Sequence, residues 1–215
     1  MKRTFYFLLT TVLFILSLKA QTEQKTTKNI LDNMIVAFHA NGDVKADFTL
    51  KVFQKSQPPI ELQGTLQLKG EKFLLKTDKI TIWFDGKTQW SYWNNDNEIN
   101  VTTPTPEELQ SINPYALLSA YQKGFEYKTG TLTHFQGKSV YEVILTAIDK
   151  KQEISSVRLY IAKSTYQPVY IMMEQQGGNS NEITIIRYQI KQRYDDSIFT
   201  FNKKQYPYVE IIDLR

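Results

Sequence analysis

The chain has 215 residues and no cysteine, and its 26 basic and 22 acidic residues give a formal net charge of +4. The lack of cysteine excludes disulfides, thiolate metal sites and a cysteine nucleophile. The basic excess does not indicate nucleic acid binding, because Lys2, Arg3 and Lys19 lie in an N-terminal segment that we expect to be removed. Without them the chain has 23 basic and 22 acidic residues, a net charge of +1.

Residues 1–20 have the layout of a secretory signal peptide. Two cations precede an apolar stretch over residues 5–18, and polar sequence follows Ala20. An uncleaved anchor is the alternative, but this stretch is shorter than the roughly 20 apolar residues that a spanning helix needs. We therefore predict cleavage after Ala20, export, and one domain over residues 21–215, since domains usually have about 100–200 residues.

The first segment after the signal, residues 23–40, is predicted to be a helix. Its apolar residues recur at three- and four-residue spacing and form one stripe, which consists of Ile30, Leu31, Met34, Ile35 and Phe38. Asn41-Gly42 follows directly and is typical of a helix end.

Alternating apolar and polar residues then predict short antiparallel strands joined by turns. Asp85-Gly86 indicates a hairpin with a two-residue type I′ turn. Both central positions of that turn need positive φ, which Asp-Gly tolerates better than most residue pairs. Two short helices are expected in the middle of the chain, one starting near residues 103–108 and one over residues 113–121. The pattern as a whole predicts a mainly β (α+β) fold of about eleven strands. Twelve segments are candidates for these strands, near residues 48–52, 60–68, 73–75, 80–84, 90–92, 98–101, 125–133, 139–148, 153–162, 168–175, 182–190 and 208–214.

The large apolar sheet face has two possible fillings. Alternation gives each strand one apolar face, and the predicted helices are too few to cover a long curved sheet. The space above the sheet is either a filled core or a lined cavity with the helices as a lid. The pattern alone favours the filled core, because apolar side chains usually pack against each other.

A set of ordered motifs resembles the LolA outer-membrane lipoprotein carriers, loosely from Asn29 to Arg215. The motifs are Gly64-x-Leu66-x-Leu68-Lys69-Gly70-x-x-Phe73, Ile82-x-Phe84-Asp85-Gly86-Lys87-x-x-Trp90-x-Tyr92, Glu98-x-x-Val101, Asn113-Pro114-Tyr115-x-Leu117-Leu118 and the ending Tyr208–Asp213. The resemblance implies an unclosed β-barrel with a helical lid over a hydrophobic cavity. It also implies a monomeric periplasmic protein that takes acylated lipoproteins from an inner-membrane ABC transporter and passes them to an outer-membrane receptor.

The residues that we expect to line such a lipid-binding cavity come from the sheet, the first helix and the lid. They are Met34, Phe38, Phe48, Leu50, Leu62, Leu66, Phe73, Ile82, Phe84, Trp90, Tyr92, Tyr115 and Leu118. Lys69 stands at a turn where the better-known carriers have an arginine that helps to hold the lid, so it is a possible lid latch. Lysine lacks the planar fork of arginine, so lid control or the cargo differs in this chain.

No enzyme, metal site or cofactor is predicted. His39 and His134 are the two histidines, and neither lies in a metalloprotease motif. The sequence contains no nucleophile elbow and no phosphate loop.

Two alternatives to the lipoprotein carrier stay open: a carrier or sensor of another lipid or glycolipid on the same fold, and a β-sandwich binding module. Trp83 and Trp93 then either form a partner-binding patch or pack under a neighbouring segment.

Overall fold

The computed structural model describes residues 25–94, 96–106, 108–109 and 124–215. The predicted signal peptide lies outside these described residues, as does the predicted second short helix with Tyr115 and Leu118. Within the described ranges, no helix is both long enough and apolar enough to cross a membrane.

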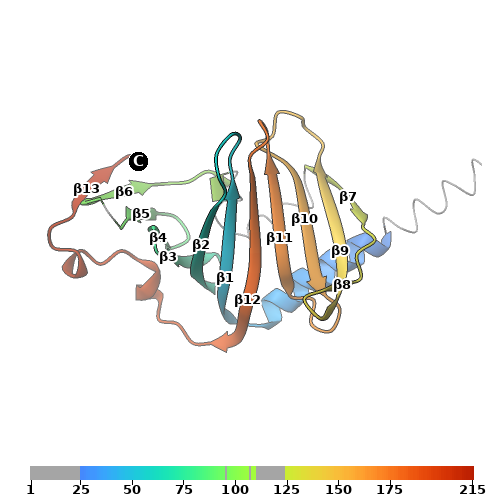
Figure 1. Ribbon diagram of the computed structural model, residues 1–215. Coiled ribbons are helices and arrows are strands. Elements are labelled where there is room, and N and C mark those ends of the chain that lie inside the picture. Colours follow the sequence, from blue (N-terminus) through green and yellow to red (C-terminus); the bar gives the residue numbers. More distant parts are fainter. Residues whose placement is uncertain (1–24, 95, 107, 110–123) are drawn as a thin grey trace, which may run out of the picture.

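Among the described residues, thirteen strands form one strongly curved, unclosed sheet (Figure 1). In chain order they are β1 (Asp43–Phe53), β2 (Ile60–Lys69), β3 (Lys72–Thr77), β4 (Ile80–Phe84), β5 (Gln89–Trp93), β6 (Glu98–Thr102), β7 (Phe125–Thr129), β8 (His134–Phe135), β9 (Lys138–Ala147), β10 (Ile154–Ala162), β11 (Pro168–Gln175), β12 (Ser180–Gln192) and β13 (Glu210–Asp213). Their spatial order is β13-β6-β5-β4-β3-β2-β1-β12-β11-β10-β9-β7, with β8 paired to β9. The predicted mainly β fold with a large curved sheet is confirmed, and the predicted count of about eleven strands is slightly low.

The first and the last long strands meet in the centre of the sheet. β1 pairs with β12 over its whole length, with Phe48 opposite Ile185 and Leu50 opposite Ile183. This antiparallel pairing joins a meander of β1–β6 to a second meander of β7 and β9–β12. The residues that face each other across this central pair are more than a hundred positions apart in the sequence, so no local pattern predicts their contact.

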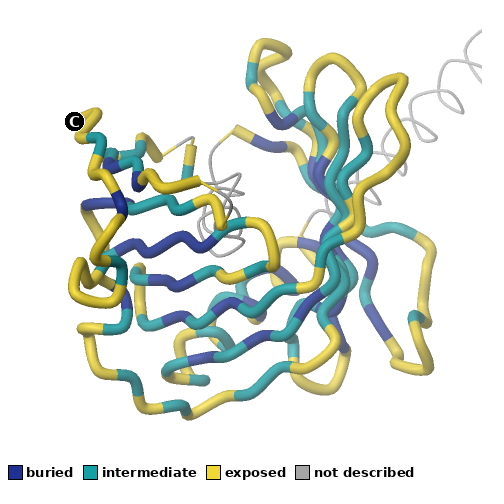
Figure 2. Tube along the Cα trace, turned by 60° about the vertical axis from the view of Figure 1, so that its left-hand side comes forward, coloured by how far each residue is buried: buried dark blue, intermediate teal, exposed yellow. Residues whose placement is uncertain are grey.

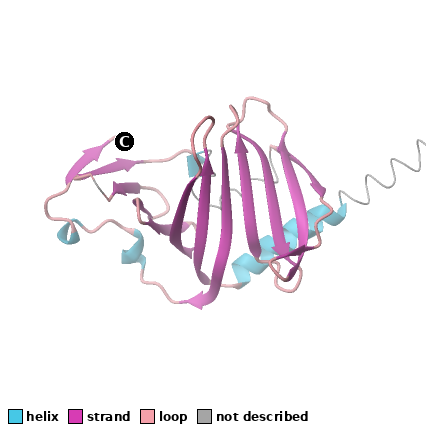
Figure 3. Cartoon of the chain, in the orientation of Figure 1, coloured by secondary structure: helices cyan, strands magenta, loops and turns pink. Residues whose placement is uncertain are grey.

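The N-terminal helix, described over residues 25–40, crosses the sheet behind β9 and β10 in the view of Figure 1, and Figure 3 shows it as the longest helix drawn in colour. Ile30, Leu31 and Met34 are at most 5% exposed. They form one core cluster with apolar side chains of β7, β9, β10 and β11. The predicted apolar stripe is therefore the face by which the helix packs on the sheet.

The predicted helix start near residues 103–108 is confirmed for the residues that the structure describes there. Residues 106, 108 and 109 are helical. The hydroxyl of Thr105 accepts a hydrogen bond from the backbone N–H of Glu108, and the Glu108 carboxylate accepts one from the backbone N–H of Thr105. This reciprocal pair is a capping box, which satisfies two backbone donors at a helix N-terminus.

The last part of the chain, residues 193–215, forms what we call the C-terminal strap. It contains two short 3₁₀ helices, η1 (Asp196–Phe199) and η2 (Lys203–Gln205), and ends in β13, which runs parallel to β6. Phe199 and Val209 are buried in a cluster with Leu74 and Trp83 of the sheet. The strap thus covers the face of β3–β6 that carries Leu74 and Trp83, which we call the outer face.

Trp83 and Trp93 have different surroundings. The Trp83 ring makes edge contacts with Phe201 and Tyr206 of the strap, each at 5.7 Å between ring centroids. The interpretation that Trp83 packs under a neighbouring segment is therefore confirmed. Trp93 is 49% exposed.

Candidate functional site

The concave side of the central strands carries an unbroken apolar surface, which we call the inner face. Residues directly opposite each other in an antiparallel pair share a face. Across β1 and β2 the inner-face pairs are Val44 with Leu68, Ala46 with Leu66, Phe48 with Gly64, and Leu50 with Leu62. The same face continues through Phe73 and Leu75 of β3 to Phe84 and Ile82 of β4, and on the other side to Ile185 and Ile183 of β12.

A cavity of about 170 Å³ lies on this inner face. Nine of the side chains around it are apolar, and the tenth is an asparagine. The lining residues are Ala46, Phe48, Leu50, Leu66, Leu75, Ile82, Met173, Asn181, Ile183 and Ile185. They come from β1, β2, β3, β4, β11 and β12, so the cavity spans the junction of the two meanders.

Several residues predicted to line the cavity are at it or next to it. Phe48, Leu50, Leu66 and Ile82 are lining residues. Phe73 and Phe84 are buried in the same cluster with ring centroids 5.3 Å apart, and Leu62 shares the inner face opposite Leu50. Phe38 of the helix packs against this cluster, whereas Met34 belongs to the cluster under the helix. Their role in binding a lipid stays a prediction.

The expectation that Trp90 and Tyr92 share the inner face is wrong. Trp90 pairs with Trp83 and Tyr92 with Thr81, and both tryptophans belong to the cluster under the strap. The reason is the length of the turn. Phe84 pairs with Gln89, so four residues connect β4 to β5 and the inner positions change from even to odd numbers.

The hairpin itself is confirmed, although its turn differs from the expected one. Gly86 adopts a φ of +100°, which suits glycine, whereas Asp85 does not adopt a positive φ. The Asp85 carboxylate accepts hydrogen bonds from the backbone N–H groups of Lys87 and Thr88 at 2.9 and 2.8 Å. Asp85 therefore stabilises a longer loop with its side chain, which the short motif did not predict.

Lys69 makes contacts that the sequence does not predict. Its Nζ donates to the backbone oxygen of Tyr194 at 2.7 Å and forms an ion pair with Asp196 at 2.8 Å. Lys72 binds the other carboxylate oxygen of Asp196 at 2.6 Å. Two hydrogen bonds lower the pKa of Asp196 to about 2, and the one from Lys69 has a larger effect than the one from Lys72. Lys69 thus holds the C-terminal strap on the outer side of the sheet. The predicted lid segment lies outside the described residues, so the role of Lys69 as its latch stays a prediction.

Six of the ten lining residues are not among the predicted ones. Ala46 and Leu75 lie on or beside predicted strands, and their position in the alternation marks them as inner residues. Met173, Asn181, Ile183 and Ile185 also alternate on β11 and β12. Their membership of the cavity depends on the pairing of β12 with both β1 and β11, for which the sequence contains no local signal.

Gly64 lets an aromatic ring reach this surface. A Cβ atom at this position would lie 2.5 Å from Cζ of Phe48 and 2.7 Å from the backbone oxygen of Lys76. Both distances are shorter than van der Waals contact allows, so the ring of Phe48 occupies space that only glycine leaves open. The glycine of the first motif therefore sets the position of a cavity wall.

The electrostatic character of the cavity is neutral. None of its lining residues is charged. Tyr188 packs against the same cluster, and burial raises the pKa of its hydroxyl to about 12. Over the described residues, no group of three or more histidine, cysteine or acidic side chains has an arrangement that holds a metal ion. The cavity is suited to hold an apolar group away from water, and the amide of Asn181 is the one polar side chain in its lining.

The comparisons with known proteins agree with this geometry. The family model described as outer membrane lipoprotein carrier protein LolA matches residues 16–178. An uncharacterized conserved protein from Thermus thermophilus has the same fold, with a TM-score of 0.60, 10% identity, and coverage of 87% of this chain and 99% of that one. A DUF1329 family protein from Desulfovibrio piger has a TM-score of 0.51 and 10% identity, with coverage of 83% of this chain and 97% of that one.

A search of curated proteins found no match to this chain. The two solved structures are too distant in sequence to show more than the fold. The family model, in contrast, covers more than half of the chain, including the helix and the strands β1 to β11. The chain therefore belongs to the family of the outer membrane lipoprotein carrier protein LolA.

Proposed function

We propose that this protein is an exported carrier that shields the acyl chains of lipoproteins and moves them through the periplasm from the inner to the outer membrane. The observation that carries the proposal is the neutral apolar cavity on the inner face of a LolA-family sheet. Removing an acyl chain from water gains about 0.8 kcal/mol for each CH₂ group. An acylated protein therefore needs such a cover in an aqueous compartment.

The size of the cavity limits how much of a chain it holds in this state. Its volume of about 170 Å³ is close to that of an apolar cavity of ~150 Å³ that stays dry and binds benzene. It thus accommodates a segment of roughly six carbons, worth about 5 kcal/mol of transfer free energy. Longer or multiple chains require the inner face to open further, which an unclosed sheet permits because its edges are not bonded to each other.

The cargo route and the partners are also part of the proposal. A membrane transporter of the ABC class would supply the lipoprotein, and an outer-membrane receptor would accept it. The description of the matching family, outer membrane lipoprotein carrier protein, supports a lipoprotein cargo and an outer-membrane destination. Binding and release by such a carrier form no covalent bond, so the proposal assigns no catalytic residue and no cofactor. The other predicted lining residues on or beside the described inner face are Leu62, Phe73, Phe84, Phe38 and Met34. We propose them as surfaces that a longer chain contacts when the inner face opens.

A substitution that fills the cavity tests the proposal. Ile183 lines the cavity from β12, and Ile183→Trp places an indole in the space that the ligand would occupy. Ile186 lies on the same strand among outer-face residues such as Asp47 and is 62% exposed, so Ile186→Trp is the matched control. The measurement is the affinity for a fluorescent triacylated lipopeptide, together with the urea midpoint of each variant.

We expect Ile183→Trp to weaken lipopeptide binding at least tenfold, which corresponds to losing about 1.4 kcal/mol. The control should bind like the wild type. Equal binding by both folded variants would show that the acyl chain does not occupy this cavity, and the proposed function would lose the observation on which it rests.

A further inference from the structure

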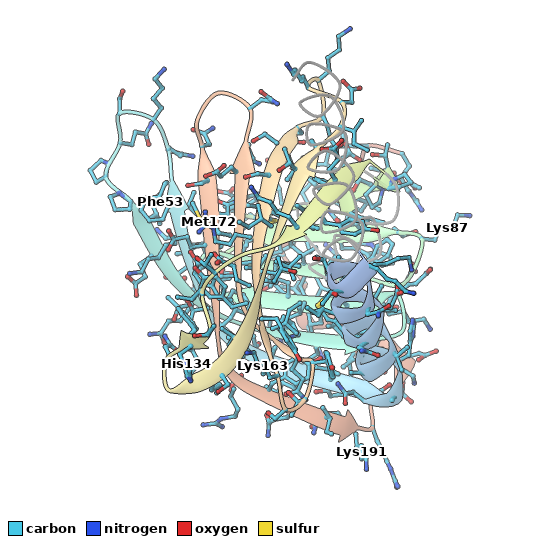
Figure 4. All side chains as sticks on the ribbon, turned by 90° about the vertical axis from the view of Figure 1, so that its right-hand side faces the viewer. Phe53, Lys87, His134, Lys163, Met172 and Lys191 are labelled. Atoms are coloured by element: carbon cyan, nitrogen blue, oxygen red, sulfur yellow. The ribbon has the colours of Figure 1, made fainter. Side chains whose placement is uncertain are left out.

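The cavity has a buried end and an open end. The inner-face residues of β1 are buried at Val44, Ala46 and Phe48, and become half-buried at Leu50 and Val52. The paired strand shows the same gradient, from 5% exposure at Leu68 to 45% at Ile60. Figure 2 shows that these strands end in exposed loops. Solvent therefore reaches the inner face from the end of β1 where Phe53 is labelled in Figure 4.

Asn181 stands at this open end. It pairs with Val52 of β1 on one side and with Met173 of β11 on the other. Its side chain shares the inner face with Ile183 and Ile185, which follow at alternate positions toward the buried end. Asn181 and Ile185 are four residue steps apart along the strand, a distance of roughly 13 Å at about 3.3 Å per residue.

The Asn181 amide is the polar side chain in an otherwise apolar lining. Among the described residues, its side chain has no hydrogen-bond partner, and its half-buried position leaves the amide accessible from the open end. An amide offers two N–H donors and one carbonyl acceptor. Binding sites that are mainly apolar commonly use a few such polar groups to fix the orientation of the ligand.

We propose that Asn181 donates a hydrogen bond to the carbonyl oxygen of the ester or amide that links an acyl chain to its headgroup. This inference rests on the proposed function, because it needs an acyl chain in the cavity. The chain then points its methyl end toward Ala46 and Leu66, and its headgroup leaves through the open end between the β1–β2 and β11–β12 loops. The cavity selects acyl esters and amides over hydrocarbons, which have no acceptor for the amide.

The same geometry disfavours a free fatty acid. An ionised carboxylate that enters an apolar cavity loses its hydration, and this cost is large unless a cation pairs with it. No lysine or arginine is among the residues that line the cavity. A neutral carbonyl group loses much less hydration free energy than a carboxylate when it enters the cavity. One hydrogen bond from Asn181 replaces much of that loss. The ligand class is thus a chain with a neutral acyl link.

The test compares three ligands of equal chain length on the full protein: methyl laurate, dodecane, and laurate at neutral pH. Each competes with a fluorescent acyl probe for the wild type, for Asn181→Leu and for Asn181→Asp. The aspartate keeps the size and polarity of the side chain but, when ionised, cannot donate a hydrogen bond. Thr184→Val on the opposite face of β12 is the control, and urea midpoints verify that every variant folds.

The wild type should bind the ester more tightly than either the hydrocarbon or the carboxylate. Both Asn181 variants should bind the ester roughly three- to tenfold more weakly, whereas Asn181→Leu should bind dodecane no more weakly than the wild type does. Unchanged ester binding in both variants, with all ligands still binding, overturns the role of Asn181 and leaves the carrier function standing. Tighter binding of laurate than of the ester overturns the neutral ligand class. Failure of the wild type to bind any of the three ligands overturns both proposals.

Discussion

Gly64→Ala adds one methyl group between the ring of Phe48, which lines the cavity, and the backbone of the neighbouring strand β3. The new Cβ would lie 2.5 Å from the ring of Phe48 and 2.7 Å from the backbone oxygen of Lys76. The ring can turn, but the oxygen belongs to a strand that is paired to β2. The ring of Phe48 must therefore move further into the cavity that it lines, and the strands must separate slightly.

The expected cost follows from overpacking in a packed position. Adding a methylene group to a packed core costs about 1–3 kcal/mol, which is a large part of a typical stability of about 5–15 kcal/mol. With a urea m-value of about 2 kcal/mol per molar, the unfolding midpoint should fall by roughly 0.5–1.5 M at an unchanged slope. Because Phe48 takes up cavity volume, the affinity for the fluorescent lipopeptide should fall as well.

The double variant Gly64→Ala/Phe48→Leu separates the two contacts. Leucine removes the ring and relieves the clash with the side chain, while the contact with the oxygen of Lys76 remains. The double variant should therefore be more stable than the sum of the two single effects predicts, since neighbouring substitutions are not additive. A Gly64→Ala midpoint equal to that of the wild type would refute the close approach of Phe48 to Gly64.

Two further predictions concern the C-terminal strap. Phe199→Ala removes a side chain of the strap that is fully buried against the sheet and should cost about 3–5 kcal/mol in urea unfolding; a loss below about 1 kcal/mol would mean that the strap is not packed on the sheet. The pKa of Asp196 is lowered from 3.8 to about 2, so its ion pairs with Lys69 and Lys72 stabilise the folded state above about pH 4 and this contribution is lost as the pH falls through about 2. Asp196→Asn should therefore unfold at lower urea than the wild type at neutral pH, with the difference shrinking as the pH falls below 4 and vanishing below about pH 2; a difference that does not shrink with pH would contradict the assignment.

Local patterns predict the long helix and most strands of the described residues, but not the short strand β8 or the two 3₁₀ helices. The stripe that contains Ile30, Leu31 and Met34 predicts the helix and its packing face, because helical spacing alone decides which residues share a side. Alternation predicts the strands of both meanders for the same kind of reason. Part of the cavity lining is accessible in this way, including Phe48 and Leu66.

The positions of Trp90 and Tyr92 show how a turn limits such reasoning. Their alternation holds within β5, but carrying it across the hairpin requires counting the residues of the loop. A hairpin connection of two or of four residues changes the inner positions from even to odd numbers, so the loop length alone places Trp90 and Tyr92 on the outer face.

Long-range contacts are not accessible from local patterns. The pairing of β1 with β12 brings Ile183, Ile185 and Asn181 to the cavity, and it depends on how the two meanders join. Lys69 and Asp196 are far apart in the sequence, and nothing near Lys69 indicates that a strap from the end of the chain returns to it. These contacts follow from the assembly of the whole sheet, which local patterns do not encode.

Native mass spectrometry shows whether the folded protein carries an acyl ligand. The mature protein is isolated from the exporting compartment and measured before and after incubation with micelles of a triacylated lipoprotein. If the inner cavity binds acyl chains, added masses that match acyl lipid or lipoprotein, bound one to one, should appear in the wild type and in Ile186→Trp but not in Ile183→Trp. A ligand-free mass under all of these conditions, from protein that is folded, would contradict the claim that the inner cavity carries acyl chains.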